Sequence, residues 1–222
     1  MTALPALPVV PLVSTYSLAK QGVFRTIQGE GVMLGVPMVF ARLAGCPVGC
    51  VGCDTNYAPK RELTLEQLVD LVSCNYYGSG YEWVWLTGGE PTVYDLYSLC
   101  SALRARLFGV RIAVATSGIN RLHEGRATGG VDFLSVSPHG PASTWVQRSG
   151  SQLNLVPGLN GLRLDDPDML DALHECAGRF SVRYVTPLHD SEESYRQAVS
   201  FVQTRRGWRL GAQAHVDSWR IP

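Results

Sequence analysis

The length, composition and charge of the chain exclude several classes of protein. It has 222 residues, 45% of them hydrophobic, which is enough for one sizeable core but too few for two full domains. Lys plus Arg and Asp plus Glu are equal at 19 each, so the formal net charge is +0 and no nucleic-acid partner is indicated. No apolar stretch reaches the length of a bilayer span, so no membrane association is expected either.

The N-terminal segment is apolar and is interrupted by Pro5, Pro8 and Pro11. It lacks the basic start of a secretion signal, so we interpret residues 1–15 as a proline-rich tail on a cytoplasmic protein, with one domain over 16–222. Six cysteines are too few for a disulfide scaffold at this length. Three of them are scattered singly through apolar segments and are expected to be core thiols: Cys74, Cys100 and Cys176.

Strand and helix patterns alternate along the rest of the chain. Thr64 and Gln67 form a capping-box pattern before one helix, and Asp166 followed by Pro167 begins another. The expected strand segments, two of which end in glycine turns, are 37–45, 81–91, 110–118, 131–138, 161–164, 179–190 and 208–215. The expected helices are 64–75, 94–108, 166–177 and 191–207.

This alternation predicts an α/β fold with a parallel sheet of about six strands. Such a sheet is either doubly wound or an incomplete parallel β/α barrel. Polar and glycine-rich groups directly follow the strands, as in "TGGEP", "TSG", "SPH" and "TPLHD". Because the carboxyl edge is where parallel sheets and barrels build their sites, we expect the functional residues there.

The segment "GCPVGCVGCDT" (45–55) follows the first expected strand and contains Cys46, Cys50 and Cys53. A structural zinc site needs four ligands, usually in two pairs, and no partner pair is visible. A disulfide would leave one thiol over, and the surrounding glycines shape a loop and fill no core. An iron–sulfur cluster fits better, because three thiolates can hold a four-iron cluster and leave one iron open for a ligand.

The combination of CxxxCxxC with a strand that ends in "TGGEP" (87–91) resembles the radical S-adenosylmethionine (SAM) enzymes. In those enzymes the open iron binds the methionine part of SAM. Glycines let the backbone approach a ligand, and Glu90 offers a charged acceptor. Taken alone, "GGE" would indicate only a strand-to-helix turn.

A longer upstream match narrows the resemblance. The segment 23–46 carries a phenylalanine, a "TIQGEG" turn, a G-x-P and an F-x-R-L strand before the cysteines, and "CDT" follows them. This order is similar to that of the 7-carboxy-7-deazaguanine synthases, and the likeness extends through "TSG" and "SP" to the C-terminal "QAH". It rests on Phe24, Thr26 to Gly31, Gly35, Pro37, Phe40, Arg42, Leu43 and residues 53–55.

The resemblance implies an incomplete barrel with the cysteine loop at its carboxyl edge. It also implies a lyase that converts 6-carboxy-5,6,7,8-tetrahydropterin to 7-carboxy-7-deazaguanine with loss of ammonia, in 7-deazapurine (queuosine-type) biosynthesis. The implied cofactors are a 4Fe-4S cluster, SAM and Mg²⁺. The implied partners are a small pterin substrate, a second copy of the chain in a homodimer and a flavodoxin-like electron donor.

The same resemblance assigns the site residues. Cys46, Cys50 and Cys53 would hold the cluster, Thr55 would contact Mg²⁺, and Arg42 would clamp the pterin carboxylate. The residues assigned to SAM are Gly52, Cys53, Asp54, Gly88, Gly89, Glu90, Ser117, Ser137, His139 and Thr186. The residues assigned to the substrate are Ile27, Gln28, Gly29, Glu30, Arg42, Thr87, His215 and Pro222.

The match departs from the family pattern at several positions. Gly52 stands where the superfamily usually has an aromatic residue beside adenine, and Tyr57 could substitute for it. His139 and Val216 stand where lysine is common. The alternatives are another small radical enzyme, such as a glycyl-radical activase, and a non-enzymatic iron–sulfur or zinc protein. An activase would not need the segment from "TIQGEG" to Arg42.

Overall fold

One twisted sheet forms the centre of the protein in the computed structural model, which describes residues 15–217 apart from 52, 54, 126–129 and 177. The order of its nine strands is β3-β1-β2-β4-β5-β6-β7-β8-β9. All pairings from β2 to β9 are parallel, whereas β1 pairs antiparallel with β2 and β3. The strands are β1 (Thr15–Ile27), β2 (Pro37–Leu43), β3 (Arg61–Thr64), β4 (Trp83–Gly88), β5 (Arg111–Thr116), β6 (Phe133–Val136), β7 (Gly150–Leu155), β8 (Phe180–Val185) and β9 (Trp208–Leu210).

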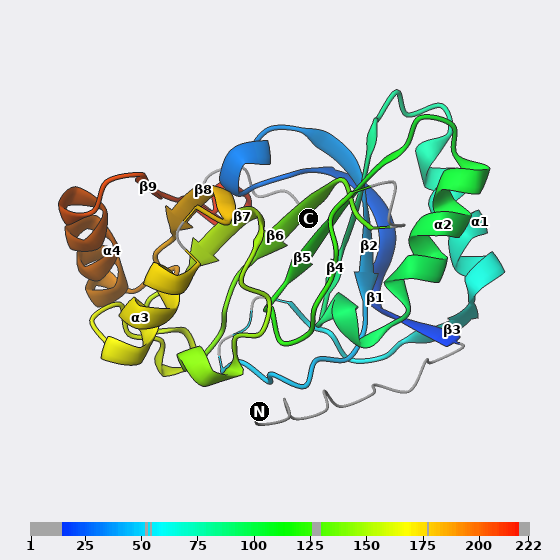
Figure 1. Ribbon diagram of the computed structural model, residues 1–222. Coiled ribbons are helices and arrows are strands. Elements are labelled where there is room, and N and C mark those ends of the chain that lie inside the picture. Colours follow the sequence, from blue (N-terminus) through cyan, green and yellow to red (C-terminus); the bar gives the residue numbers. More distant parts are fainter. Residues whose placement is uncertain (1–14, 52, 54, 126–129, 177, 218–222) are drawn as a thin grey trace, which may run out of the picture.

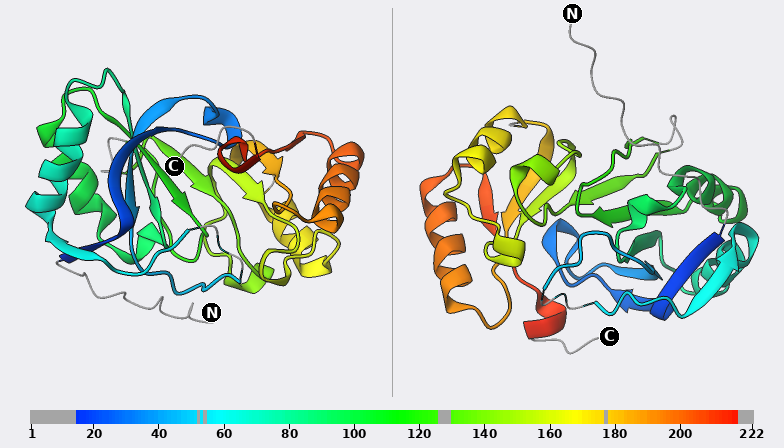
Figure 2. Two further views of the ribbon diagram at one scale, coloured as in Figure 1. Left: turned by 180° about the vertical axis from the view of Figure 1, so that it is seen from behind. Right: turned by 90° about the horizontal axis from the view of Figure 1, so that it is seen from below.

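Helices flank the two ends of this sheet, with α1 and α2 at one end and α3 and α4 at the other (Figures 1 and 2). The edge strands β3 and β9 are not paired with each other in the described part of the chain, so the barrel is incomplete, as expected. The helices are α1 (Leu65–Tyr76), α2 (Leu96–Arg106), α3 (Pro167–Glu175), α4 (Glu192–Thr204) and α5 (Ala214–Asp217), and the short 3-10 turns are η1 (Gly31–Met33), η2 (Pro91–Val93), η4 (Ala142–Thr144) and η5 (Leu159–Gly161).

Alternation along β2 and β4 gives the sheet two different faces. Val39, Ala41 and Leu43 of β2 pack with Val84 and Leu86 of β4 in the main core. The intervening residues point to the opposite face, where two methionines and several aromatic rings form a second, smaller cluster: Met33, Met38, Phe40, Trp83, Trp85 and Ala113. Since successive strand residues alternate between faces, Arg42 and Thr87 follow Phe40 and Trp85 on this second face.

The caps that the sequence predicts are present. The Thr64 side chain accepts a bond from the Gln67 backbone N–H, and the Gln67 side chain accepts one from the Thr64 N–H, which completes the capping box of α1. Asp166 caps α3 by accepting from the Met169 N–H, and Pro167 is the first residue of that helix.

Other expectations about the elements are wrong. Residues 161–164 form no strand, because the chain turns there with positive φ at Gly158, Asn160 and Gly161. The strand lies earlier, in β7, where inward-facing Gln152 and Asn154 interrupt the apolar pattern. The strands β1 and β3 were not expected, and residues 1–14 of the predicted tail lie outside the described part.

The three scattered cysteines differ in their surroundings. Cys100 and Cys176 are buried as expected, and burial raises the pKa of the Cys100 thiol to about 12. The expectation for Cys74 is wrong, because it lies on the solvent face of α1 and is exposed.

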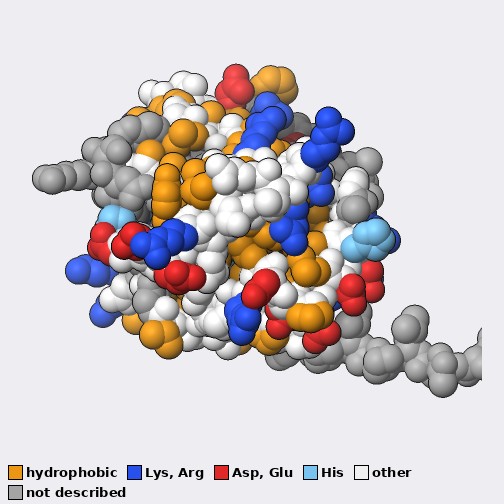
Figure 3. Space-filling view, turned by 90° about the vertical axis from the view of Figure 1, so that its left-hand side faces the viewer, with side chains coloured by type: hydrophobic (Ala, Val, Ile, Leu, Met, Phe, Trp, Pro, Cys, Tyr) orange, Lys and Arg blue, Asp and Glu red, His pale blue; other side chains and the backbone are white. Residues whose placement is uncertain are grey.

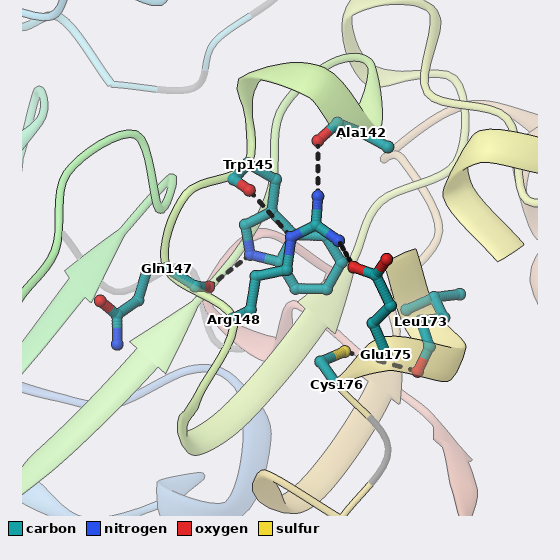
Figure 4. Close-up of polar contacts among 7 residues, drawn as sticks. All are labelled: Ala142, Trp145, Gln147, Arg148, Leu173, Glu175 and Cys176. Atoms are coloured by element: carbon teal, nitrogen blue, oxygen red, sulfur yellow. Dashed lines mark hydrogen bonds and ion pairs between the residues drawn. The ribbon is translucent and has the colours of Figure 1, made fainter. Parts of the chain in front are cut away.

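Arg148 ties the segment after β6 to α3 (Figure 4). Its guanidinium donates to the carbonyls of Trp145 and Ala142 and forms an ion pair with Glu175, with N–O distances of 3.1, 3.2 and 2.8 Å. The same group lies over the Trp145 ring, 5.2 Å from its centroid. One side chain thereby fixes a loop that has little regular structure of its own.

The surface at the α4 end of the molecule carries basic and acidic side chains interspersed with hydrophobic ones (Figure 3). This mixture agrees with the balanced charge of the sequence. Over the residues that the structure describes, no helix has both the length and the apolar character of a membrane span.

Candidate active site

A cavity of about 510 Å³ lies at the carboxyl edge of the parallel strands, where the sequence predicts a site. Its wall runs from the end of β1 through the cysteine loop and the ends of β4 to β7 to the start of α5. It collects most of the predicted site residues: Ile27, Gln28, Gly29, Glu30, Arg42, Cys46, Cys50, Cys53, Thr55, Thr87, Gly88, Gly89, Glu90, Ser117, Ser137, His139 and His215.

The remaining predicted residues do not line this cavity in the described structure. Gly52, Asp54 and Pro222 lie outside the described residues. Thr186 is buried behind the wall, where its hydroxyl donates to Asn154 Oδ1 at 2.7 Å, and Asn154 itself lines the cavity. Thr186 therefore positions a cavity residue. Tyr57, considered as a replacement for the missing aromatic residue, does line the cavity.

The cysteine loop follows β2 directly and presents its thiols to the cavity. Cys46 and Cys50 are half-buried and Cys53 is exposed. Burial, together with the neighbouring Cys53 and Cys46 thiols, raises the pKa of the Cys50 thiol to about 11. Three thiolates gathered here need a strongly cationic group to neutralise them.

The spacing of these thiols indicates what that group is. Among the described residues, no three His, Cys, Asp or Glu side chains converge closely enough to hold a single metal ion. A mononuclear zinc site requires such convergence, whereas each thiolate of an iron–sulfur cluster binds a different iron. The arrangement therefore fits a cluster better than a zinc ion.

The turn after β4 packs directly against the start of the cysteine loop. The Gly89 N–H donates to Leu43 O at 2.8 Å, and the Glu90 N–H donates to Gly45 O at 2.9 Å. A Cβ atom at Gly89 would lie 1.9 Å from Gly45 O, so only glycine allows this approach. The glycine turn after β4 therefore also holds the start of the cysteine loop against the end of that strand.

The Glu90 side chain joins the end of β4 to the end of β5. Its carboxylate is 1% exposed and accepts from the Thr92 and Thr116 hydroxyls at 2.7 and 2.6 Å and from the Ser117 N–H at 2.7 Å. The Ser117 hydroxyl also donates to it. These donors satisfy the buried carboxylate oxygens of Glu90, which can attract a cationic group in the cavity.

The end of β1 and the C-terminal segment close the opposite side of the cavity. Glu30 Oε1 accepts from Gln213 Nε2 at 2.8 Å and lies 3.9 Å from His215 Nε2. The Ala214 N–H donates to Gly29 O at 3.0 Å, and a Cβ atom at Gly29 would lie 2.3 Å from His215 Nδ1. The glycine of "QGE" is therefore required for His215 to reach this wall.

Arg42 lies between the cysteine loop and the aromatic face of the sheet. Its Nη1 donates to Thr55 Oγ1 at 2.9 Å, and its guanidinium carbon lies 5.6 Å from the centroid of the Phe24 ring. The side chain is half-buried and borders the cavity. The positive charge of Arg42 therefore faces the part of the cavity between Thr55 and the aromatic residues, where it can attract an anionic group.

Sequence reasoning missed the polar residues of β6 and β7 that line the cavity. Gln152 donates to Ser135 Oγ at 3.1 Å and accepts from the Val32 N–H at 2.9 Å, which anchors η1 over the sheet. Ser135 and Asn154 line the same wall, as do the aromatic residues Phe40 and Trp85. The alternation in "SQLNL" is the signal that could have identified β7 and its inward-facing amides.

Comparison with known proteins places the chain in a family. A model of the Radical SAM superfamily matches residues 42–155. The 7-carboxy-7-deazaguanine synthase of Escherichia coli (strain K12) is 30% identical over 231 residues, covering 86% of this chain and 94% of that protein. The synthase of Bradyrhizobium diazoefficiens is 32% identical over 219 residues, covering 90% of this chain and 97% of that protein. The chain belongs to the 7-carboxy-7-deazaguanine synthase family.

A solved structure agrees with this assignment at the level of the fold. The crystal structure of QueE from Escherichia coli aligns with a TM-score of 0.67 and 24% sequence identity, over 90% of this chain and 94% of that one. The resemblance inferred from "TIQGEG", the cysteines and "TGGEP" is thereby confirmed. Membership of the radical SAM superfamily implies a 4Fe-4S cluster and SAM, and the three separated thiols fit that cluster.

The close packing of Gly89 on Gly45 generates a prediction. Gly89→Ala should lower the free energy of unfolding by about 1–3 kcal/mol, the usual cost of overpacking, and should displace the cysteine loop. Urea unfolding and iron content after anaerobic reconstitution measure the two effects. Gly109→Ala is the control for iron content, because nothing lies within 4 Å of its Cβ position, although its φ of 75° is strained for alanine and should lower the free energy of unfolding as well. Full iron content in both variants would contradict the role of Gly89.

Proposed function

We propose that this protein converts 6-carboxy-5,6,7,8-tetrahydropterin to 7-carboxy-7-deazaguanine, with release of ammonia, as the reaction of its family implies. One observation carries the proposal: a single cavity brings the "TIQGEG" turn, Arg42, the three thiols and Glu90 together. An activase that acts on a partner protein would not need the "TIQGEG" turn or Arg42.

Cys46, Cys50 and Cys53 would hold the 4Fe-4S cluster and leave one iron open toward the cavity. The chemistry that the cluster and SAM supply when bound is the reductive formation of a 5′-deoxyadenosyl radical. The chain's contribution is to orient the reactive carbon and exclude water. The aromatic rings of Phe40 and Trp85 support that exclusion, since they form an apolar wall beside the thiols.

The SAM end of the cavity would be formed by the turn at Gly88 to Glu90 together with Ser117, Ser137 and His139. Glu90 provides the negative charge that attracts the methionyl ammonium group. Hydroxyl donors around it can rotate to other acceptors when that group arrives. His139 extends this wall toward the cluster, with its Nδ1 3.3 Å from Cys50 Sγ and its Nε2 3.2 Å from Ser137 Oγ.

The pterin would lie between the end of β1 and Arg42. Gln28 is buried and held in place by its own loop, since its Oε1 accepts from the Glu30 N–H at 3.2 Å. Ile27, Gln28 and Gly29 would read the polar edge of the substrate, with Thr87 beside them on the sheet. Glu30 and His215 would complete the wall, and the guanidinium of Arg42 would bind the carboxylate through two parallel hydrogen bonds.

Magnesium would bind at Thr55 only together with the substrate. The threonine hydroxyl is a hard oxygen ligand, but the cationic Arg42 lies 2.9 Å from it. The substrate carboxylate would neutralise this cation and supply further oxygen ligands. We therefore include Mg²⁺ as a cofactor that follows the substrate into the site.

Three further proposals concern the surroundings of the enzyme. As the resemblance implies, the protein would form a homodimer, would receive electrons from a flavodoxin-like protein and would work in the cytoplasm. The balanced formal charge of the sequence is compatible with each of them.

Replacement of one proposed cluster ligand tests the function. Cys50→Ala should leave the chain folded, because the thiol lies in a loop, but should abolish turnover of 6-carboxytetrahydropterin. Wild-type protein should bind about four irons after anaerobic reconstitution, and SAM should alter its spectrum. Cys74→Ala is the matched control, because this cysteine is exposed on α1. Wild-type turnover by Cys50→Ala would refute the ligand assignment, and one bound zinc would refute the function.

The magnesium proposal predicts that Mg²⁺ raises turnover of the wild-type enzyme and that Thr55→Ala blunts this response, because a hard oxygen ligand is lost. Thr55→Ser keeps the oxygen and should retain the response. Turnover measured across a Mg²⁺ titration provides the comparison. An equal response in all three proteins would show that Thr55 does not bind the ion.

The carboxylate clamp predicts that Arg42→Lys lowers kcat/KM by about 10-fold to 1,000-fold, because lysine keeps the charge but loses the fork geometry. Iron content should stay unchanged, and uncoupled formation of 5′-deoxyadenosine should persist. Arg25→Lys is the control, since Arg25 donates to the carbonyls of Asn75 and Tyr77 away from the cavity. Unchanged kinetics in Arg42→Lys would place the carboxylate elsewhere.

A further inference from the structure

The turn η5 (Leu159–Gly161) carries an asparagine that reaches the cysteine loop. Asn160 has φ 48° and ψ 34°, the left-handed conformation that non-glycine residues rarely adopt. The turn follows β7, and glycines with positive φ occupy positions 158 and 161. Asparagine tolerates this conformation better than most side chains, and unlike glycine it brings an amide.

Both ends of that amide contact the cysteine loop, 110 residues away in sequence. The Asn160 Nδ2 group donates to Cys50 Sγ at 3.2 Å, and its Oδ1 accepts from the Val51 N–H at 3.2 Å. The Val51 side chain is 89% exposed, so it contributes little packing that could hold the loop in place. The amide therefore fixes the sulfur and the following backbone N–H together.

We propose that Asn160 is a positioning residue for the iron–sulfur cluster, which raises its reduction potential and retains it in the loop. The inference rests on the proposed function at one point, namely that Cys50 is a ligand. When a cluster gains an electron, the added negative charge spreads onto its sulfur ligands. An N–H donor to a sulfur stabilises the reduced state more than the oxidised one, so hydrogen bonds to the sulfurs help to set the potential.

The two contacts of the amide have separable effects. The Nδ2 donor acts on the electron affinity of the cluster, because it touches the sulfur. The Oδ1 acceptor acts on retention of the cluster, because it ties the loop backbone to η5. His139 also approaches Cys50, with Nδ1 3.3 Å from Sγ, while its Nε2 lies 3.2 Å from Ser137 Oγ.

Two substitutions at Asn160 distinguish these effects. Asn160→Asp keeps the acceptor for the Val51 N–H but replaces the donor to sulfur by an anionic oxygen. Asn160→Gly removes both contacts and adopts positive φ at no cost. Asp190→Gly is the matched control, because Asp190 also has positive φ (58°) and its side chain is 87% exposed.

The measurement is the midpoint potential of the reconstituted cluster, followed by electron paramagnetic resonance in a redox titration without SAM. Both Asn160 variants should lower the ratio of reduced to oxidised cluster at a fixed potential by about tenfold, which is about 59 mV for a one-electron couple. Iron release to a chelator should accelerate severalfold in Asn160→Gly and stay close to wild type in Asn160→Asp. Asp190→Gly should change neither quantity.

Wild-type potentials in both Asn160 variants, each with about four irons bound, would overturn the inference and leave the proposed function intact. A uniform loss of iron in both variants with unchanged potential in the remaining cluster would assign Asn160 a structural role only, and would also overturn it. A wild-type chain that holds no cluster would overturn the inference together with the ligand assignment.

Discussion

The contact between two backbones, at Gly89 and Gly45, determines where every cofactor group of this site can lie. Parallel pairing of β2 with β4 brings Leu43 beside Gly88, and the two chains then leave the sheet together. With no Cβ atom at position 89, the turn after β4 touches the first residue of the cysteine loop. The thiols and the carboxylate of Glu90 consequently come from different strands but share one rigid edge.

The same strand pairing explains why one cavity can hold both charged and apolar groups. Residues of β2 and β4 alternate between the main core and the aromatic face, so Arg42 follows Phe40 on the cavity side. A cation beside aromatic rings is well suited to bind a planar, anionic molecule, since the rings contact its faces and the guanidinium contacts its carboxylate. The preference for a planar anion that we propose for this site therefore follows from the strand period of two.

Much of this architecture could be predicted from the sequence, and the exceptions have physical causes. The carboxyl-edge location, the cysteine loop and the glycine turn all follow from local patterns, because each lies next to an apolar strand with a clear boundary. β7 was misplaced because Gln152 and Asn154 face a polar cavity, so the strand lacks the apolar run of its neighbours. Cys74 was assigned to the core because sequence spacing alone did not establish which face of α1 it occupies. Contacts between distant segments, such as Asn160 with Cys50, leave no local pattern at all.

The pairing of Gly29 and Glu30 with Gln213 and Ala214 joins segments from near the two ends of the described chain. Contacts between residues so far apart in sequence form only when the whole intervening chain has collapsed correctly. On a ribosome, β2 and the cysteine loop emerge well before the wall at His215. A nascent chain can thus present its thiols long before it can enclose a substrate. A deletion of α5 would leave the sheet intact and the cavity open to water on the side of His215.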